Sequence, residues 1–258
     1  MNRLTACLIT RNEEDNLPRA LASLKGIADE IVVVDCGSTD RTVEMARENG
    51  ARVLTRAWTN YSEQRNFAAE QASHDWILAV DADEEISEEL SKSIREWKAG
   101  TPQHPVYEMA RRTWYLGAWI RHSGWYPDYI KRLYRRDAAR FAGIIHESVS
   151  PENDTACVGR LRGDLLHYTV RTFAEHEEKV ERYTTLSAQQ MYAEGKRNWR
   201  AAVWLATPWA WFRSFVLQLG FLDGYRGAVI AQMAARAVRL KYKKLGRFAA
   251  RQAAKTSQ

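Results

Sequence analysis

The 258-residue chain has few cysteines, lacks a long apolar run and carries no acidic residue after Asp223. Cys7, Cys36 and Cys157 are odd in number and scattered, which argues against a disulfide framework and favours a reducing compartment. The apolar stretches all fall short of the ~18 residues that a membrane-spanning helix needs. Pro208 and Arg213 interrupt the best candidate. We therefore expect neither a disulfide-stapled protein nor an integral membrane protein.

The composition that remains is that of a globular protein. Hydrophobic residues make up 45% of the chain and charged residues 27%, both ordinary values, and the length suffices for one large domain or two small ones. Because the chain opens into a strand-like segment at 4–9, we expect no signal peptide. We find no internal repeat and no low-complexity stretch.

The first hundred residues alternate between strand-like and helix-like patterns. Apolar runs of four to six residues predict strands, and capping residues followed by periodic apolar positions predict helices between them. Such alternation favours a parallel sheet with helices on both faces. The expected strands are 4–9, 30–35, 52–55 and 76–80, and the expected helices are 16–25, 39 or 40 to 48, 62–72 capped by Ser62, and 87–97 capped by Ser87.

The remaining chain divides into two further parts. The segment 100–105 breaks the alternation, residues 106–150 are β-rich and irregular, and the pattern from Thr172 onward is helical. In the first of these helices Phe173, Val180, Tyr183 and Leu186 can face inward. We expect boundaries near 100 and 170.

The acidic segment Val80-Asp81-Ala82-Asp83-Glu84-Glu85 is the most informative motif. It follows a buried strand, so its carboxylates lie at the ligand-binding edge of an open α/β sheet. Mg²⁺ prefers oxygen ligands and commonly sits between one or two carboxylates and substrate phosphates. A second strand, 30–35, ends similarly in Asp35 and a polar loop. The alternative for Asp81 and Asp83 is a solvated turn that caps the next helix.

Four motifs taken in order resemble those of the family-2 inverting glycosyltransferases. They are Thr10-Arg11-Asn12-Glu13, the segment 33–40, Gln64-Arg65-Asn66 and the acidic segment 80–84. A narrower resemblance, to bacterial lipopolysaccharide-core β-1,4-glucosyltransferases that act on heptose, is carried by the following segments: His146-Glu147, His167-Tyr168, Lys179, Arg182-Tyr183 and Phe221-Leu222-Asp223-Gly224.

The resemblance implies the α/β class with a GT-A fold, that is, a Rossmann-like, mostly parallel sheet flanked by helices, here with a C-terminal helical extension. On that fold, residues 1–100 would form the nucleotide-sugar-binding half, 101–170 the acceptor-binding and catalytic half, and 171–258 a helical, basic, membrane-associating region. The implied donor is a UDP-sugar, used with Mg²⁺ or Mn²⁺.

The same resemblance assigns roles to single residues. Thr10, Asn12 and Glu13 would line the nucleoside pocket, with Asp35 at the uracil edge. Arg65 would reach the base or the phosphates, Asp81 would lie against the ribose and the metal, and Asp83 would bind the metal directly. The chain departs from the family at Cys36, where a second Asp is common, so one nucleoside contact is absent.

Inverting transfer also needs a base that takes the proton of the acceptor hydroxyl. Glu147 is the first candidate, because it follows a small turn and an apolar pair that can present it in a cleft. His146 is the second candidate by its intrinsic pKa, and it can equally ligate the metal. The alternative for this pair is a hydrogen-bonded core turn. His167 is either a third metal ligand or a structural histidine.

Basic pairs in the middle of the chain suggest an anionic acceptor, because arginine pairs suit phosphate and carboxylate groups. Nearby aromatic rings offer stacking faces for sugars. The alternative is a solvated basic surface. The basic residues are Arg111, Arg112, Arg121, His122, Lys131, Arg132, Arg135, Arg136 and Arg140, and the aromatic ones are Trp114, Tyr115, Trp119, Trp125 and Tyr126.

The C-terminal region combines aromatic residues, from Trp199 to Phe221, with a basic tail. Aromatic rings flanked by Lys and Arg are typical of an interfacial membrane anchor and argue against a nucleic-acid partner. The alternative is a helical subdomain with its aromatics in its own core. We expect a cytoplasmic protein, peripheral on the inner face of the cell membrane.

The leading hypothesis is a metal-dependent hexosyltransferase that moves a hexose from a UDP-sugar to an inner-core heptose or a related envelope glycolipid. The favoured hexose is glucose. The first alternative is a glycosyltransferase of another envelope polysaccharide. Two hypotheses of other classes are a phosphohydrolase with Asp81 as nucleophile and a non-catalytic basic adaptor on anionic membranes.

Overall fold

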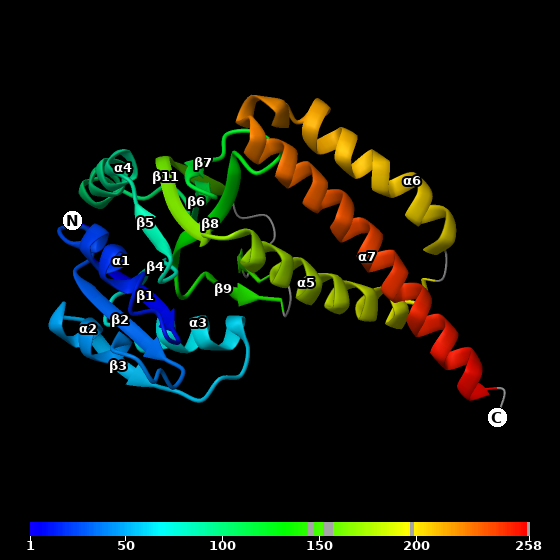
Figure 1. The fold of residues 1–258 in the computed structure, drawn as a ribbon. Coiled ribbons are helices and arrows are strands. Elements are labelled where there is room, and N and C mark those ends of the chain that lie inside the picture. Colours follow the sequence, from blue (N-terminus) through cyan, green and yellow to red (C-terminus); the bar gives the residue numbers. More distant parts are fainter. Residues whose placement is uncertain (144–146, 152–156, 197–198, 257–258) are drawn as a thin grey trace. The chain divides into compact units, whose positions relative to one another are not determined.

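The computed structural model describes residues 1–143, 147–151, 157–196 and 199–256. The chain forms two compact units (Figure 1). The first contains residues 1–112 and 128–168, and the second contains 113–127 and 169–258. The acidic segment and the predicted nucleoside pocket belong to the first unit, and the aromatic and basic C-terminal region belongs to the second.

The sheet of the first unit has a parallel part and an antiparallel part. The order β3-β2-β1-β4 is parallel throughout, as the sequence predicted. Beyond β4 the order continues β8-β6-β11-β5, with antiparallel pairing of β4 to β8, β8 to β6 and β11 to β5. The bounds are β1 Leu4–Thr10, β2 Glu30–Asp35, β3 Arg52–Thr55, β4 Trp76–Ala79, β5 Glu84–Ile86, β6 Val106–Tyr115, β8 Asp128–Arg135 and β11 Val158–Val170.

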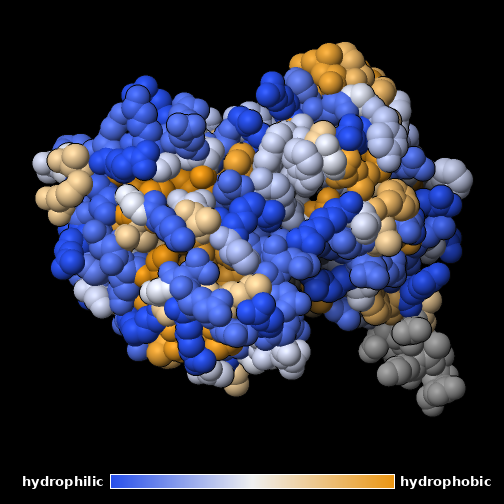
Figure 2. Space-filling model, turned by 60° about the vertical axis from the view of Figure 1, so that its left-hand side comes forward, coloured by the Kyte–Doolittle hydropathy of each residue, from blue (hydrophilic) through white to orange (hydrophobic). Residues whose placement is uncertain are grey.

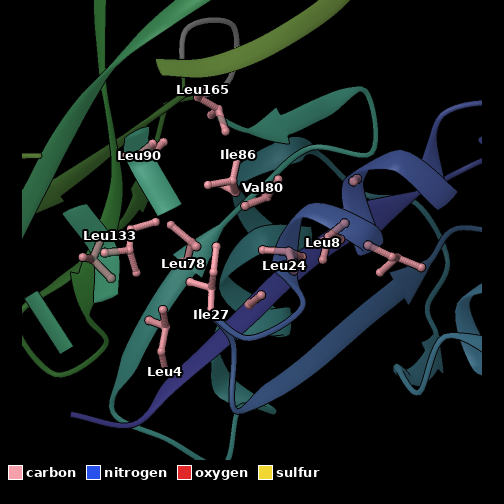
Figure 3. Packing of buried hydrophobic residues seen from close by; sticks show 14 of the residues in the cluster. Leu4, Leu8, Leu24, Ile27, Leu78, Val80, Ile86, Leu90, Leu133 and Leu165 are labelled. Carbon is pink, nitrogen blue, oxygen red and sulfur yellow. The ribbon is translucent and has the colours of Figure 1, made fainter. Parts of the chain in front are cut away.

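Helices cover both faces of this sheet. Alternate residues of β1 point to opposite faces, so Leu4, Ala6 and Leu8 join one apolar cluster and Cys7 joins the other. Figure 3 shows residues of the first cluster, among them Leu24, Leu78 and Leu90. It includes residues of α1 Leu17–Leu24, α2 Thr42–Glu48 and α4 Glu88–Ala99, and the second cluster includes residues of α3 Tyr61–Glu70.

Two caps test the predicted helix starts. Ser87 caps α4 as predicted, since its hydroxyl accepts a hydrogen bond from Leu90 N. The prediction for α3 was wrong, because Asn60 is the cap and accepts from Glu63 N at 2.9 Å. Ser62 instead donates its hydroxyl to the carbonyl of Gly143 at 2.6 Å. An asparagine two residues upstream caps at least as well as a serine, and this choice leaves Ser62 free to tie the helix to the 139–143 segment.

The second unit is mainly helical. Its helix α7 packs against both α5 and α6. The elements are β7 Ala118–Trp119, α5 Phe173–Ala193, α6 Trp199–Phe212, a π-helical turn η1 Arg213–Leu217, a 3-10 turn η2 Gly220–Asp223 and α7 Tyr225–Thr256. The first unit also has a separate two-stranded sheet of β9 Ala139–Ala142 and β10 Ser148–Pro151.

The inward face predicted for α5 was wrong except at Val180. Phe173, Tyr183 and Leu186 are exposed, whereas Val180, Thr184 and Ala188 are buried. These three residues are four apart and form one stripe. Lys244 of α7 lies along this stripe and donates to the Glu181 carbonyl at 2.8 Å and to the Thr184 hydroxyl at 2.9 Å. The buried face of α5 therefore includes oxygen atoms that accept hydrogen bonds from the buried amine of Lys244.

Candidate active site

The predicted nucleoside residues meet at the ends of β1 and β2. Thr10 and Asp35 are register partners in adjacent parallel strands, and the Thr10 hydroxyl donates to Asp35 Oδ1 at 3.0 Å. The other oxygen of Asp35 accepts from Gly37 N and Ser38 N, at 2.9 and 2.8 Å. Because Asp35 is buried and its carboxylate is engaged by its own loop, it shapes that loop in this structure.

Asn12 connects the loop after β1 to the loop after β2. Its backbone is left-handed, with φ of 56°, a conformation that asparagine tolerates better than most residues. Its N–H donates to the Ser38 hydroxyl at 2.8 Å, and its side-chain oxygen accepts from Thr39 N at 2.8 Å. Glu13 N donates to the Thr42 hydroxyl at 2.7 Å. Thr10, Asn12, Glu13 and Asp35 thus lie along one edge of the sheet, and their role as a nucleoside pocket stays a prediction.

Asp81 lies between two buried arginines. Arg65 Nη2 lies 2.7 Å from Asp81 Oδ1, and Arg132 Nη2 lies 2.7 Å from Asp81 Oδ2. Arg132 also donates to Glu84 Oε1 at 3.1 Å, and Glu84 is fully buried. The Asp81 N–H donates to Glu84 Oε2 at 2.9 Å. Two carboxylates and two guanidiniums therefore balance one another behind the acidic segment.

This arrangement keeps Asp81 ionised. Burial by itself raises the pKa of Asp81, but the positive charges of Arg132 and Arg65 outweigh burial and hold that pKa far below its usual range. For Arg132, burial lowers the pKa, and the carboxylates of Asp81 and Glu84 more than reverse this effect. Since both Asp81 oxygens contact arginines, Asp81 in this structure orients two cations rather than presenting a free carboxylate.

Asp83 faces a histidine from a neighbouring strand. Its Oδ2 lies 3.2 Å from His167 Nε2, because β5 pairs with β11 and sets His167 opposite Glu84. The backbone carbonyl of Asp83 also accepts from Tyr168 N at 2.9 Å. The carboxylate of Asp83 suits Mg²⁺ or Mn²⁺, provided that water and phosphate oxygens supply further ligands, and the imidazole of His167 fits Mn²⁺ better than Mg²⁺, which prefers oxygen.

Protein side chains alone do not complete a metal site here. Within the described ranges, no group of three or more His, Cys, Asp or Glu side chains is arranged to hold a metal ion. Mg²⁺ characteristically keeps waters and binds through one or two carboxylates plus substrate phosphates. The pair Asp83 and His167 therefore fits a metal that arrives with a diphosphate, and less well a metal held permanently by the protein.

The two base candidates differ in what the structure describes. Glu147 Oε1 lies 3.9 Å from Arg65 Nη2, so Glu147 lies in the same cluster as Asp81. His146 lies outside the described residues. Arg65 thus contacts Asp81 and lies near Glu147. It connects the acidic segment, which contains the candidate metal ligand, to the candidate base.

Several of the predicted acceptor-binding cations are paired within the protein. Arg111 donates to Asp128 at 2.7 Å, and Arg112 forms an ion pair with Asp164. Arg135 pairs with Asp137, and Arg136 lies 3.3 Å from Asp75. The aromatic rings also pack on one another: Trp114 on Trp119 and Tyr115 on Trp125. These contacts favour a structural role for most of this basic and aromatic set.

Arg132 is the site residue whose role the sequence did not suggest. It shares its strand face with Ile130 and Tyr134, two positions away on either side, and Tyr134 is buried. A charge at an inward position of a strand needs a buried partner. The alternation Ile130, Arg132, Tyr134 was therefore a usable signal for a buried arginine.

The motif around Asp223 and the residue Lys179 have local structural contacts. Asp223 accepts hydrogen bonds from the backbone N–H groups of Arg121 and His122, at 3.1 and 3.0 Å, and from the Ser123 hydroxyl at 3.0 Å. Lys179 donates to the carbonyl and the hydroxyl of Thr169, at 2.6 and 2.7 Å. Both residues hold turns of the second unit in place.

The chain belongs to glycosyl transferase family 2, whose model matches residues 5–149. The match includes every motif at the strand ends described above. With this membership the α/β class and the GT-A architecture expected from the sequence are confirmed, and the C-terminal helical extension is present as α5 to α7.

Relatives match over most of the chain. An uncharacterized glycosyltransferase of Rickettsia typhi is 33% identical over 89% of this chain and 82% of its own length. The lipopolysaccharide core biosynthesis glycosyltransferase LpsC of Rhizobium meliloti is 32% identical over 90% of each chain. Among solved structures, residues 1–349 of S. aureus TarS in complex with UDP-GlcNAc are 18% identical, covering 97% of this chain and 92% of that one, with a TM-score of 0.48.

Proposed function

We propose that this protein transfers a hexose from a UDP-sugar to an inner-core heptose of lipopolysaccharide or to a related envelope glycolipid, with inversion at the anomeric carbon. The hexose that we favour is glucose. Membership of glycosyl transferase family 2 and the similarity to LpsC over nine-tenths of both chains support this proposal. The observation that carries it is the pair formed by Asp83, which follows β4, and His167 of β11, whose side chains lie 3.2 Å apart.

The donor end of the reaction depends on charge. A divalent cation held by Asp83 and His167 would act as a Lewis acid that stabilises the leaving diphosphate. Arg65 and Arg132 lie beside the same segment and are paired with Asp81 and Glu84, so that they fix the segment from which Asp83 extends. Thr10, Asn12, Glu13 and Asp35 form the edge on which the nucleoside rests.

At the acceptor end, we assign the base to Glu147. In the ground state its carboxylate lies within 3.9 Å of Arg65. This distance places the Glu147 carboxylate beside the cluster that contains Asp81, where an acceptor hydroxyl could approach it. Holding the acceptor hydroxyl in line with the anomeric carbon contributes to the rate as well, since well-oriented reactants can gain several kcal/mol, roughly 7–11 in the best cases.

The C-terminal region supports a peripheral place on the membrane. Eleven of the eighteen exposed large hydrophobic side chains in the described chain lie between residues 204 and 225, which we call the exposed aromatic segment. Trp204 is 80% exposed and Leu205 is 72% exposed. Figure 2 shows hydrophobic side chains gathered at the upper right of the molecule. Contiguous exposed apolar surface of this kind marks a binding face for a protein or a membrane.

The basic residues that follow favour the anionic, inner face of the cell membrane, because Lys and Arg near such a surface each contribute about 1 kcal/mol. No helix in the described part of the chain is long and apolar enough to cross a membrane. Binding would therefore be interfacial. Lys244 is excluded from this role, because its amine is committed to Glu181 and Thr184.

A transfer assay tests the proposed reaction. The purified chain is incubated with Mn²⁺, a lipopolysaccharide acceptor truncated at the inner-core heptose, and in turn UDP-glucose, UDP-galactose or UDP-GlcNAc. We expect one hexose to be added from UDP-glucose and the new linkage to be β. Transfer to other envelope glycans alone would overturn the acceptor, and absence of transfer from every donor would overturn the reaction.

A further inference from the structure

A long groove lies between α6 and α7 in the second unit. Its volume is about 860 Å³, which is within the range of small-molecule binding sites. One stripe of α6 and one stripe of α7 form its walls, at helical spacings of three and four residues. The lining residues are Trp199, Arg200, Val203, Trp204, Thr207, Pro208 and Trp211 from α6, and Ala235, Arg239 and Lys243 from α7.

The shape of the groove suits an extended chain. The α6 stripe runs from Trp199 to Trp211, about 18 Å at 1.5 Å per residue. At one end the indole of Trp199 lies against Gly246 of α7, so closely that an added Cβ at Gly246 would be 2.7 Å from the ring. Aromatic and aliphatic side chains line most of the remaining length. The groove thus offers an apolar track along α6, with the two helices in close contact at Trp199 and Gly246.

One polar side-chain atom in the lining of the groove has no hydrogen-bond partner from the residues that the structure describes. The hydroxyl oxygen of Thr207 is buried and has no hydrogen-bond partner among the described residues. Next to it, Pro208 lies inside the helix and has no N–H to offer the carbonyl of Trp204. Buried polar groups are normally hydrogen-bonded, so this part of the groove is built for a ligand with a polar group or a water beside an apolar chain.

The charge at the rim is entirely positive. Arg200, Arg239 and Lys243 border the groove, and no acidic residue does. No ion pair or hydrogen bond is recorded for the side chains of Arg239 and Lys243 within the described ranges. The ligand must therefore carry negative charge. A second copy of this chain is disfavoured as the occupant, because it would bring the same cations to the same surface.

We infer that this groove binds one anionic phospholipid, with an acyl chain along the tryptophan stripe and the phosphate against Arg239 and Lys243. The inference rests on the proposed membrane association, which would bring the groove next to a bilayer, since Trp204 and Trp211 belong both to the groove and to the exposed aromatic segment. It goes beyond that proposal, because a groove of fixed size binds a single lipid with a defined stoichiometry, whereas surface adsorption does not.

The test uses native mass spectrometry of the full chain with dioctanoyl phosphatidylglycerol, a lipid that is soluble as a monomer. We expect one lipid bound per chain, and at least about tenfold weaker binding of dioctanoyl phosphatidylcholine, which has the same acyl chains without net charge. The double variant Arg239→Ala/Lys243→Ala should bind phosphatidylglycerol at least about tenfold more weakly. Ala235→Phe fills the groove and keeps every charge, and this variant should also lose phosphatidylglycerol binding.

The matched control is Lys241→Ala/Arg247→Ala, which removes two charges from α7 outside the groove. It should bind the monomeric lipid like the wild type, while both double variants bind anionic vesicles more weakly to a similar extent. Three results would contradict the groove as the lipid-binding site. They are an equal loss of monomeric-lipid binding in both double variants, binding of several lipids per chain, and undiminished lipid binding by Ala235→Phe. Loss of vesicle binding alone would instead concern the proposed membrane association.

Discussion

The guanidinium of Arg132 lies 2.7 Å from Oδ2 of Asp81, and Arg132 is buried while the Asp81 side chain is partly exposed. Arg132 reaches Asp81 from β8, a strand that begins 47 residues later in the chain. The same nitrogen contacts the fully buried Glu84. Arg132 therefore bridges Asp81 and Glu84, Arg65 supplies the second positive charge, and the position of the acidic segment depends on these contacts.

The first prediction follows from this dependence. Arg132→Met keeps much of the side-chain volume but leaves Asp81 and Glu84 without one of their cations. Breaking a buried pair from one side typically costs about 3–5 kcal/mol, and we expect a loss of that order in the free energy of unfolding, measured with urea. Arg135→Met, which breaks the exposed pair with Asp137, is the control and should have little effect. Equal effects of the two changes would show that the buried cluster is not special.

The second prediction concerns acid. Glu30 accepts hydrogen bonds from Ser73, Arg52 and Thr5; burial raises its pKa, but these donors together lower it to about 2. A lowered folded-state pKa means that the stabilisation is complete above the unfolded pKa, near 4.5, and is lost as the pH falls toward 2. Glu30→Gln should therefore be less stable at neutral pH, by on the order of 2 kcal/mol.

Chemical denaturation at a series of pH values checks this effect. The difference in unfolding free energy between the wild type and Glu30→Gln should shrink as the pH is lowered through the acid range. A difference that stays constant with pH would mean that shape or packing at Glu30, and not its charge, provides the stabilisation.

The third prediction concerns the proton of the acceptor. Glu147→Gln preserves the shape of the side chain and removes its ability to accept a proton. We expect turnover to fall by about 10²- to 10⁴-fold, which is the typical contribution of a general base, while the dissociation constant for the UDP-sugar stays within about twofold, because the base acts on the acceptor. Normal turnover in Glu147→Gln together with lost turnover in His146→Ala would transfer the role to His146.

The fourth prediction concerns the membrane. Trp204→Ser/Leu205→Ser removes the two most exposed side chains of the exposed aromatic segment. Burying such a side chain contributes about 1.5–3 kcal/mol, so co-sedimentation with anionic vesicles at high salt should fall by at least about tenfold. Trp58→Ser, an exposed tryptophan of the first unit, is the control and should bind normally. Unchanged binding by the double variant would leave the segment without a role at the membrane.

Elements with a clear local sequence pattern could be predicted from the sequence, whereas elements that depend on pairing with a distant segment could not. The strands 30–35 and 52–55 were predictable because a short apolar run between turn residues is compatible with few secondary structures other than a strand. Asp83 could be placed at a strand end for the same reason. β5 was not predicted, since three residues, Glu84–Ile86, are too few to show a period and their pairing partner lies 80 positions away in β11.

Residues with more than one possible partner were the least predictable. The strand alternation around Arg132 could have indicated a buried arginine, but its partners Asp81 and Glu84 are distant in the chain and are identified only by the structure. Ser62 and Asn60 are both good helix caps, and the choice depends on a carbonyl at Gly143. Tyr183 is apolar enough to face a core, but the amine of Lys244 selects the stripe of small and polar residues beside it.

The central claim is that Asp83 helps to hold a divalent cation together with a nucleoside diphosphate. Its most direct test is the melting temperature of the purified chain with UDP, with and without Mn²⁺, for the wild type, for Asp83→Asn and for the exposed control Asp75→Asn. A ligand at a hundred times its dissociation constant stabilises by about 2.7 kcal/mol. We predict a rise of several degrees with UDP and Mn²⁺ in the wild type and in Asp75→Asn, and little or no rise in Asp83→Asn or with EDTA. An equal rise in Asp83→Asn, or one that EDTA does not reduce, would contradict the account.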